Sequence, residues 1–273
     1  MKTQILAILS IIGLILSGTG DISAFDNFPE AKKIAQKYSE YYKNKFTRIF
    51  KDGPIYTGDG TAYGSSTNGG NCLFPKVEYY KDMMYAAINN QQYHADMGCG
   101  ACALVVSTSN PYKPIRIRII DQCPECAHGS LDFSDKAFKA LTNMNPSRVK
   151  IAWALIPCDA DVPDYPALVK KDSDIKFQFK TGSSQWWFQV QIFNTKYPVA
   201  SVDMKVNGSY APLSRLAHNY WEKPNGDVGA GPYDFKVILA DNTVIEAKGV
   251  TMAVPGDDEG DEYSTGTQTI INH

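Results

Sequence analysis

The six cysteines of this chain all lie between residues 72 and 158, although the sequence continues to residue 273. If they pair, they brace this stretch as one covalently closed domain and leave the rest of the chain to a separate unit. Two of their spacings, Cys99-x-x-Cys102 and Cys123-x-x-Cys126, would also suit a structural zinc ion. The remaining two cysteines are Cys72 and Cys158.

The N-terminus favours disulfides over zinc. Lys2 precedes an apolar run over residues 5–16, and small residues follow around Ser23 and Ala24, which is the three-part pattern of a secretory signal peptide. We expect a signal over residues 1–24, with cleavage near Ala24 and residues 18–20 as a second possibility. The apolar run is shorter than the roughly 20 residues that span a bilayer. We therefore expect a secreted protein of the cell exterior or cell wall, with disulfides, no metal, no cofactor and no membrane partner.

Length and charge narrow the classes further. A chain of 273 residues can hold two domains of ordinary size. With 27 Lys and Arg against 29 Asp and Glu, no broad basic face for nucleic acid is implied. We expect a monomer without a nucleic-acid partner.

The first domain is predicted to be a small closed β-barrel over residues 53–158. It follows a helical segment at 25–52, which we interpret as a packing or spacer helix because its acidic and basic residues are mixed. Glycine-rich turns separate short stretches of strand composition. The expected strands are 103–106, 115–119 and 149–156, and the expected helices are 81–88 and 135–141.

The second domain is predicted to be a β-sandwich over residues 172–255, after a linker at 159–171. Phe177 and Phe179 alternate with polar residues, as do Val190 and Val237 in later segments, and this period of two is typical of half-buried strands. The tail at 256–273 is rich in acids and has no core pattern. We expect it to be disordered.

Trp186 and Trp187 are the sharpest candidates for a binding surface. Strand alternation would bury one of the pair, so both face water only if the backbone turns or bulges at Ser184 and Gln185. Core tryptophans are the alternative interpretation. An exposed pair would form a flat platform on which pyranose rings stack their C–H faces. Tyr220 and Trp221 could extend this platform, and Lys180 could bind sugar hydroxyls.

Asp121 and Asp132 are the candidate acids of the first domain. Asp121 ends a predicted strand, and Asp132 follows a glycine turn, so both could lie in one cleft. Asp132 could instead cap the helix that follows it, but Ser134 competes for that position.

Several motifs resemble expansins. In the first domain they are Thr61-Ala62-Tyr63-Gly64, Gly69-Gly70-Asn71-Cys72, Cys99-Gly100-Ala101-Cys102, Asp121 and Gly129-x-Leu131-Asp132-x-Ser134. In the second they are Phe179-Lys180-x-Gly182-Ser183-Ser184-x-Trp186-Trp187, Asn194-x-Lys196-Tyr197-Pro198-Val199 and Asn219-Tyr220-Trp221. They cover about residues 53–255 in the right order, and the chain is most similar to the expansin-like proteins of microbes.

The resemblance implies a mainly β protein, in which a six-stranded double-psi β-barrel is followed by an immunoglobulin-like β-sandwich. It implies that Asp132 is the aspartate required for wall loosening, the general acid of the related family-45 endoglucanases. Thr61, Tyr63, Ser65 and Asp121 fall on the groove around it. The implied cellulose-binding residues are Lys180, Trp186 and Trp187, with His218 at the third aromatic position, which Tyr220 or Trp221 could replace. The implied disulfides are Cys72–Cys99 and Cys102–Cys158, and we expect Cys123–Cys126 to close a short loop at the groove.

One departure from the related hydrolases bears on the mechanism. An inverting glycosidase needs a second carboxylate as base, and where the related endoglucanases carry it this chain has Gly64-Ser65-Ser66. Asp121 and Asp59 are the acids that could replace it, although we expect Asp121 to hydrogen-bond Asp132 and raise its pKa.

The resulting prediction is a protein that binds cellulose or related β-glucans and loosens the wall without hydrolysis. The alternatives are a β-1,4-glucanase or lytic enzyme on the same barrel, and a non-catalytic polysaccharide-binding matrix protein. Asn207-Gly208-Ser209 is either a glycosylation site or a plain turn.

Overall fold

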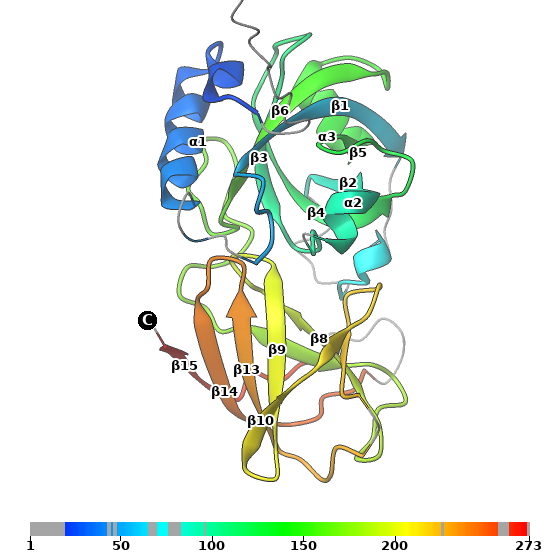
Figure 1. Cartoon of the computed structure of the whole chain (residues 1–273). Helices are drawn as coiled ribbons and strands as arrows, with labels where there is room; N and C mark the ends of the chain where they lie inside the picture. The colour runs from blue at the N-terminus through cyan, green and yellow to red at the C-terminus, as the bar shows by residue number, and fades with distance from the viewer. Residues whose placement is uncertain are drawn as a thin grey trace, which may run out of the picture.

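The computed structural model describes residues 20–42, 45, 48–64, 70–75, 83–95, 97–224, 227–255 and 262–271. These residues form a mainly β protein, in which a closed six-stranded barrel is followed by two further sheets that make a sandwich (Figure 1). The predicted fold class is therefore confirmed. Residues 1–19 of the expected signal peptide lie outside the described residues. No helix within the described ranges is both long and apolar enough to span a membrane.

The barrel strands follow the order β1-β5-β2-β4-β3-β6. The pairs β1–β5 and β2–β4 are parallel, and the other pairs are antiparallel. Three short helices interrupt the strands: η2 (Gly70–Cys72), α2 (Asn90–His94) and α3 (Asp135–Thr142). The strands are β1 (Ile55–Gly64), β2 (Tyr85–Asn89), β3 (Cys102–Ser107), β4 (Ile115–Cys123), β5 (Leu131–Ser134) and β6 (Val149–Ile156).

The expected helix at 81–88 is wrong. Residues 85–89 form β2, and all five of its residues are buried between β4 and β5. Residues 81 and 82 lie outside the described residues. A short apolar run that is buried on both sides carries no period that separates strand from helix.

The N-terminal segment packs on the outside of the barrel. It consists of η1 (Ile22–Phe25) and α1 (Pro29–Tyr42), and α1 contacts β6. Phe25 is fully buried, and the backbone N–H of Gly20 donates to the carbonyl of Ile55 at 2.7 Å. Cleavage of the expected signal peptide near Ala24 would leave the buried Phe25 in place, and this cleavage stays a prediction.

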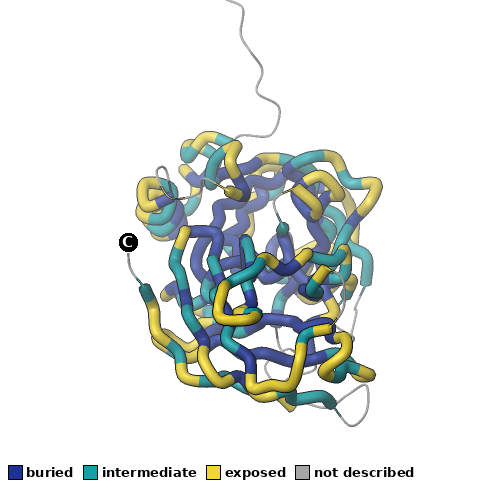
Figure 2. Tube along the Cα trace, turned by 60° about the horizontal axis from the view of Figure 1, so that its bottom comes forward, coloured by how far each residue is buried: buried dark blue, intermediate teal, exposed yellow. Residues whose placement is uncertain are grey.

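The sandwich consists of a five-stranded sheet, β10-β9-β13-β14-β15, and a four-stranded sheet, β11-β12-β8-β7. Its core is aromatic: the rings of Phe177 and Phe235 stack at 5.0 Å, and Phe188 meets Phe179 edge to face at 5.1 Å. Figure 2 shows the buried strands inside and the exposed turns outside. The strands are β7 (Lys176–Phe179), β8 (Gln189–Phe193), β9 (Val199–Val206), β10 (Ser209–Pro212), β11 (Ser214–Arg215), β12 (Trp221–Glu222), β13 (Tyr233–Leu239), β14 (Val244–Val250) and β15 (Thr267–Ile271).

The expectation of a disordered tail is also wrong for its described part. β15 pairs antiparallel with β14, and Ser264 bridges to Phe177 in the other sheet. Residues 256–261, which hold most of the acids, lie outside the described residues. The tail joins the fold by adding backbone hydrogen bonds at a sheet edge, which needs few apolar side chains.

Gln268 of β15 joins the two sheets. Its Nε2 donates to the carbonyl of Ile175 at 2.6 Å, and its Oε1 accepts from the Ile175 N–H at 3.0 Å. We expect Gln268→Ala to lower the free energy of unfolding by about 1–2 kcal/mol, because its two hydrogen bonds with Ile175 and one to the Thr265 carbonyl are lost. Chemical denaturation would measure this, with the exposed neighbour Thr269→Ala as the control. Equal denaturation midpoints for the two variants would contradict the role assigned to Gln268.

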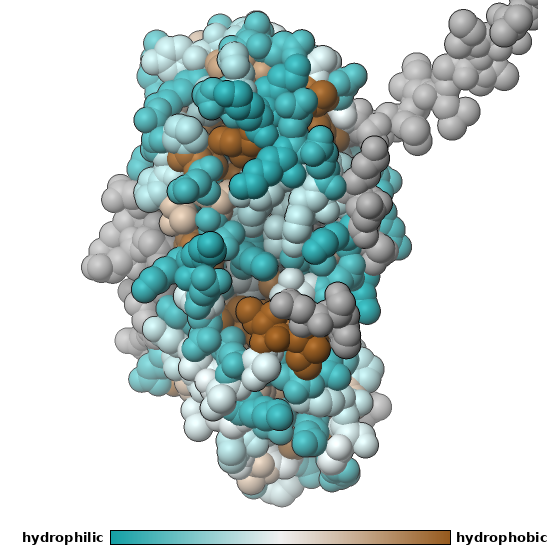
Figure 3. All heavy atoms as spheres, turned by 90° about the vertical axis from the view of Figure 1, so that its left-hand side faces the viewer, coloured by the Kyte–Doolittle hydropathy of each residue, from teal (hydrophilic) through white to brown (hydrophobic). Residues whose placement is uncertain are grey.

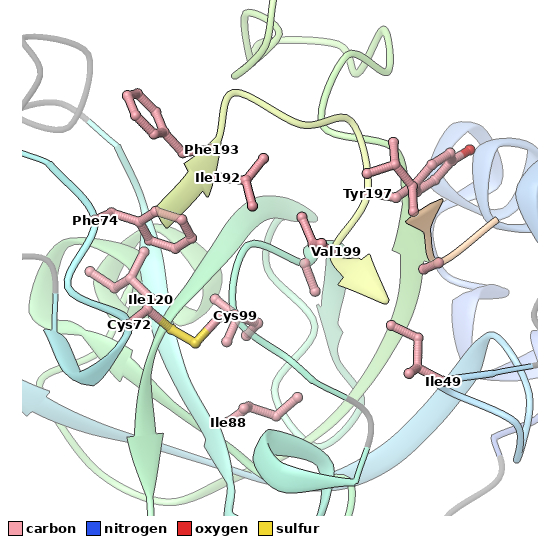
Figure 4. Close-up of a cluster of buried hydrophobic side chains, with 14 of the residues drawn as sticks. Ile49, Cys72, Phe74, Ile88, Cys99, Ile120, Ile192, Phe193, Tyr197 and Val199 are labelled. Carbon is pink, nitrogen blue, oxygen red and sulfur yellow. A yellow bond between two sulfur atoms is a disulfide. The ribbon is translucent and has the colours of Figure 1, made fainter. Parts of the chain in front are cut away.

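Apolar contacts join the barrel to the sandwich. One buried cluster contains residues of both, and Figure 4 shows Cys72, Phe74 and Ile120 of the barrel near Ile192 and Val199 of the sandwich. Hydrogen bonds support the junction. The Cys158 N–H donates to the carbonyl of Lys196, and Gln191 Nε2 donates to the carbonyl of Cys72, both at 2.8 Å. The N-terminal helix also contributes, because the rings of Tyr42 and Tyr197 meet edge to face at 5.6 Å. The two domains therefore present their surfaces in a fixed relation.

All six cysteines form disulfides, in the pairs Cys72–Cys99, Cys102–Cys158 and Cys123–Cys126. These are the expected pairs. The first links η2 to the approach to β3, and the second links the start of β3 to the end of β6. The third closes the short loop after β4.

Asn207 and Gly208 form the two-residue turn between β9 and β10. Both have positive φ, 51° and 85°, as a tight hairpin turn of this kind requires. The Asn207 side chain is exposed at this turn. The turn is thus observed, and glycosylation of Asn207 stays a prediction.

Candidate functional site

Asp132 and Thr61 lie side by side on the barrel. They are register partners in the parallel pair β1–β5, and Thr61 Oγ1 donates to Asp132 Oδ1 at 2.5 Å. Ser134 accepts from the N–H of Ala137 as the N-cap of α3. The helix-capping interpretation of Asp132 is therefore excluded, and its half-buried carboxyl is available to a ligand.

Burial raises the pKa of Asp132 above its ordinary value. The hydrogen bond from Thr61 and the charge of Arg148 lower the pKa, whereas the nearby Glu125 raises it, and the net shift is upward. We expected Asp121 to act on Asp132, and this is wrong. Asp121 Oδ1 instead accepts from the backbone N–H groups of Asn71 at 2.7 Å and of Gln122 at 2.8 Å.

Removing the Thr61 hydroxyl should raise the pKa of Asp132 further. The hydroxyl donates to the carboxylate and so stabilises its charged form. In Thr61→Val the titration of the Asp132 carboxyl carbon, followed by NMR, is expected to move to higher pH. Thr57→Val, at an exposed position of the same strand, should leave it in place. An unchanged or lowered pKa in Thr61→Val would contradict the assignment of this hydrogen bond.

Tyr63 is near enough to both groove acids for their charges to act on it. Burial, and then the charges of Asp121 and Asp132, raise its pKa, so its phenol stays protonated. Tyr63 lies at an irregular step of the β1–β5 pairing, between Ala62 and Gly64, so its placement near these acids does not follow from regular strand alternation. Ser65, the other expected groove residue, lies outside the described residues.

Asp59 continues this row but is already paired. Lys150 Nζ lies 2.5 Å and Arg148 Nη1 3.0 Å from its two carboxylate oxygens, and their hydrogen bonds lower its pKa, with Lys150 the larger cause. A carboxylate held charged by two cations is a weak proton acceptor. Asp59 is therefore poorly suited to replace a missing catalytic base.

Trp186 and Trp187 both reach the surface. Ser184 and Trp187 form a bridge, with Gln185 and Trp186 at the tip of the turn. The exposed fractions of Trp186 and Trp187 are 64% and 36%, and the next residue, Phe188, is buried in the sandwich core. The turn thus removes the alternation that would have buried one tryptophan, and the core interpretation of this pair is excluded.

Polar residues lie close together next to this turn. Lys180 Nζ donates to Gln189 Oε1 at 3.2 Å, and His218 Nε2 lies 3.3 Å from the same oxygen. Gln189 Nε2 in turn donates to Glu222 Oε2 at 2.7 Å. Burial and the charge of Lys180 lower the pKa of His218, so its ring is held neutral.

Two of the expected platform residues are not exposed. Trp221 has an exposed fraction of 3% and belongs to the core, and Tyr220 has 7%. Trp221 pairs with Val190 in the β12–β8 ladder, which directs its ring inward. Tyr220 packs against His218 at 5.4 Å between ring centroids and lies under Lys180. His218, which is partly exposed, is the residue of this segment that remains available at the surface.

Sequence reasoning missed Gln189, Glu222 and Arg148. Gln189 follows the tryptophan pair by two positions, a spacing that could have placed it on the platform side of β8. Glu222 and Arg148 gave no local signal, because sheet pairing brings them to the site. No group of three or more His, Cys, Asp or Glu residues in the described part of the chain is placed to hold a metal ion.

The fold and these surfaces define a class of two-domain β protein, in which a barrel with an acid in a polar groove adjoins a sandwich with exposed tryptophans. No family model matches the chain. It is 26% identical over 181 residues to Expansin-YoaJ of Bacillus subtilis, which covers 64% of this chain and 71% of that protein. Over 230 residues it is 23% identical to Expansin-like protein 1 of Dictyostelium discoideum, covering 80% and 73%.

Solved structures agree with these relatives. The expansin of Clavibacter michiganensis aligns with a TM-score of 0.61 and 26% identity, covering 78% of this chain and 96% of that one. A variant of that expansin in complex with cellohexaose aligns over the same shares with a TM-score of 0.62. The chain is therefore similar to microbial expansins in both sequence and fold.

Proposed function

We propose that this protein binds cellulose and related β-glucans and loosens cell walls without cutting their polymers. The observation that carries the proposal is the exposure of both Trp186 and Trp187 at a turn beside Lys180 and His218. Exposed paired tryptophans are costly in water, and they suit the apolar faces of successive pyranose rings. The complex of the Clavibacter relative with cellohexaose supports the same class of ligand.

The barrel groove supplies the second part of the activity. Thr61, Tyr63 and Asp132 present hydroxyl and carboxyl groups that exchange hydrogen bonds with sugar hydroxyls. A glucan held there and on the sandwich loses its contacts with neighbouring polymers. Noncovalent slippage of this kind needs no catalytic base.

A hydrolytic function is the second candidate, and the raised pKa of Asp132 favours it. A raised pKa moves a carboxyl toward the range in which it can donate a proton as a general acid. Against it, Asp59 is paired with Lys150 and Arg148, and the sequence has Gly64-Ser65-Ser66 where related hydrolases carry their base. We therefore favour loosening over cleavage.

The proposal includes secretion to the cell exterior, removal of residues 1–24 as a signal peptide, action on the wall as a monomer, and a glycan at Asn207. Three buried or partly buried disulfides are consistent with an oxidising compartment.

Binding to insoluble cellulose, together with extension of a clamped cellulose-containing wall strip under constant load, tests the proposal. We expect the protein to pellet with cellulose and to increase the rate of extension. Binding without extension would indicate a matrix-binding protein, and neither binding nor extension would overturn the proposal.

A further inference from the structure

A cluster of surface amides lies between the barrel groove and the tryptophan turn. Asn71 Nδ2 donates to Gln122 Oε1 at 3.1 Å, Gln122 Nε2 donates to Asn90 Oδ1, and the same Nε2 lies 3.2 Å from His94 Nε2. Asn71, Asn90 and His94 are exposed, and Gln122 is partly exposed. We call these four residues the amide cluster. None of the four is among the residues with an assigned role.

The helix α2 does not depend on Asn90 for its cap. The N-cap of α2 is Asn89, which is buried and bonds to Gln92, so Asn90 is free of that task. Hydrogen bonds between exposed amides contribute little to stability, because water replaces them readily. The cluster nevertheless holds its donors and acceptors in place through mutual contacts.

The groups present suit a carbohydrate. Each amide side chain both donates and accepts, as a sugar hydroxyl does, so one amide can bind neighbouring hydroxyls of a pyranose. The exposed ring of His94 adds an apolar surface beside them. The cluster carries no net charge when His94 is neutral, which suits an uncharged glucan better than an acidic polymer.

The cluster is continuous with both candidate binding surfaces. On the groove side, Asp121 accepts from the backbone of Asn71 and of Gln122. On the sandwich side, Asn71 Nδ2 donates to Tyr93 Oη at 2.9 Å, and the Tyr93 hydroxyl donates to the carbonyl of Ala217 at 2.7 Å. Ala217 immediately precedes His218. In Figure 1, α2, which carries Asn90 and His94, lies in the part of the barrel nearer the sandwich.

Figure 3 shows the side of the molecule that carries α1, away from α2, and hydrophilic residues predominate on it. On the side of α2, a glucan chain that crosses from barrel to sandwich needs polar contacts between its stacking positions, and the amide cluster provides them.

We propose that the amide cluster is a middle subsite, which binds the hydroxyls of a β-1,4-glucan chain that runs from the Asp132 groove to the tryptophan turn. This inference rests on the proposed function. The cluster should add binding affinity only for long oligomers, because a short oligomer binds at the tryptophan turn and does not reach the cluster.

The test is the chain-length dependence of binding, measured by calorimetry with cellotriose and cellohexaose. In the wild type, affinity should rise with oligomer length. The triple variant Asn90→Ala, Gln122→Ala, His94→Ala should bind cellohexaose about tenfold more weakly, equivalent to the loss of two or so net hydrogen bonds, and cellotriose unchanged. Asn145→Ala, an exposed amide elsewhere on the barrel, is the matched control. Each single variant is measured as well, so that misfolding of the triple variant would not obscure the result.

The outcomes separate this inference from the proposed function. If the cluster variants bind cellohexaose like the wild type while replacement of the tryptophans weakens binding, the middle subsite is wrong and the proposed function stands. If the wild-type protein binds neither oligomer nor insoluble cellulose, both are wrong. Equal loss for cellotriose and cellohexaose would also overturn the inference, because it would mean a general disturbance.

Discussion

Replacing Trp186 and Trp187 together by alanine is expected to weaken binding to insoluble cellulose by at least about tenfold. A stacked indole removes on the order of 100 Å² of apolar surface from water, worth roughly 2 kcal/mol at about 25 cal/mol per Å² before the entropic costs of binding. If each ring contributes only half of that free energy, the loss of both rings still weakens binding more than tenfold. Binding isotherms on microcrystalline cellulose would measure the loss.

The fold should tolerate this change, because both rings are on a turn outside the sandwich core. Phe188, the next residue, carries the core contacts and is left intact. The matched control is Tyr112→Ala, an aromatic residue with an exposed fraction of 54% on the loop between β3 and β4 of the barrel. Equal binding by the control and the tryptophan variant would show that exposed aromatics at this turn do not form the cellulose platform.

Asp132→Asn is expected to reduce wall extension to the level without protein while cellulose binding stays near that of the wild type. Asparagine has nearly the same shape and keeps an acceptor for the Thr61 hydroxyl, but it cannot exchange a proton or carry a charge. Loosening depends on the groove, and retention on cellulose depends on the sandwich. Wall extension and cellulose pelleting measure the two separately.

The same variant gives a stability signature. Burial raises the Asp132 pKa above its ordinary 3.8, so the folded state binds the proton more tightly than the unfolded state. Proton binding by Asp132 therefore stabilises the folded state at pH values below the pKa of the unfolded state. This contribution to the free energy of unfolding is lost as the pH rises through the pKa of the folded state. Asp132→Asn should therefore unfold at a higher temperature than the wild type at pH 7, with the difference vanishing as the pH falls below 3.8.

Asp135→Asn is the matched control for Asp132, since this acid is exposed in the first turn of α3. It should keep both extension and binding. If Asp132→Asn extended walls like the wild type, the groove acid would have no part in loosening, and the protein would act through its sandwich alone.

Strand alternation and turn chemistry carried most of the sequence prediction. Phe177, Phe179 and Val237 are buried, as the alternation predicts. Gln178, which separates the two phenylalanines, is buried as well and donates to the carbonyl of Glu262, so β7 is more deeply buried than a half-buried strand. The exposure of both tryptophans could be predicted from the sequence only on one condition. Exposure of both rings required a reversal near Ser184, and the glycine and serines before it supply one.

The features that the sequence did not predict share a cause, because pairing between residues far apart in the sequence determines them. β2 and β15 are strands because neighbouring strands complete their hydrogen bonds, and neither segment shows this locally. Trp221 is buried by its register with Val190. Asp121 bonds to Asn71 across the β4 end, a contact over 50 positions in sequence.

The central claim is that this barrel loosens glucan without cutting it, and the most direct measurement is reducing-sugar release from amorphous cellulose alongside extension of a wall strip by the same wild-type sample. The account predicts extension with no sugar release above the buffer level. Sugar release that disappears in Asp132→Asn would contradict it, because the protein would then be a hydrolase whose Asp132 works with a base other than the paired Asp59.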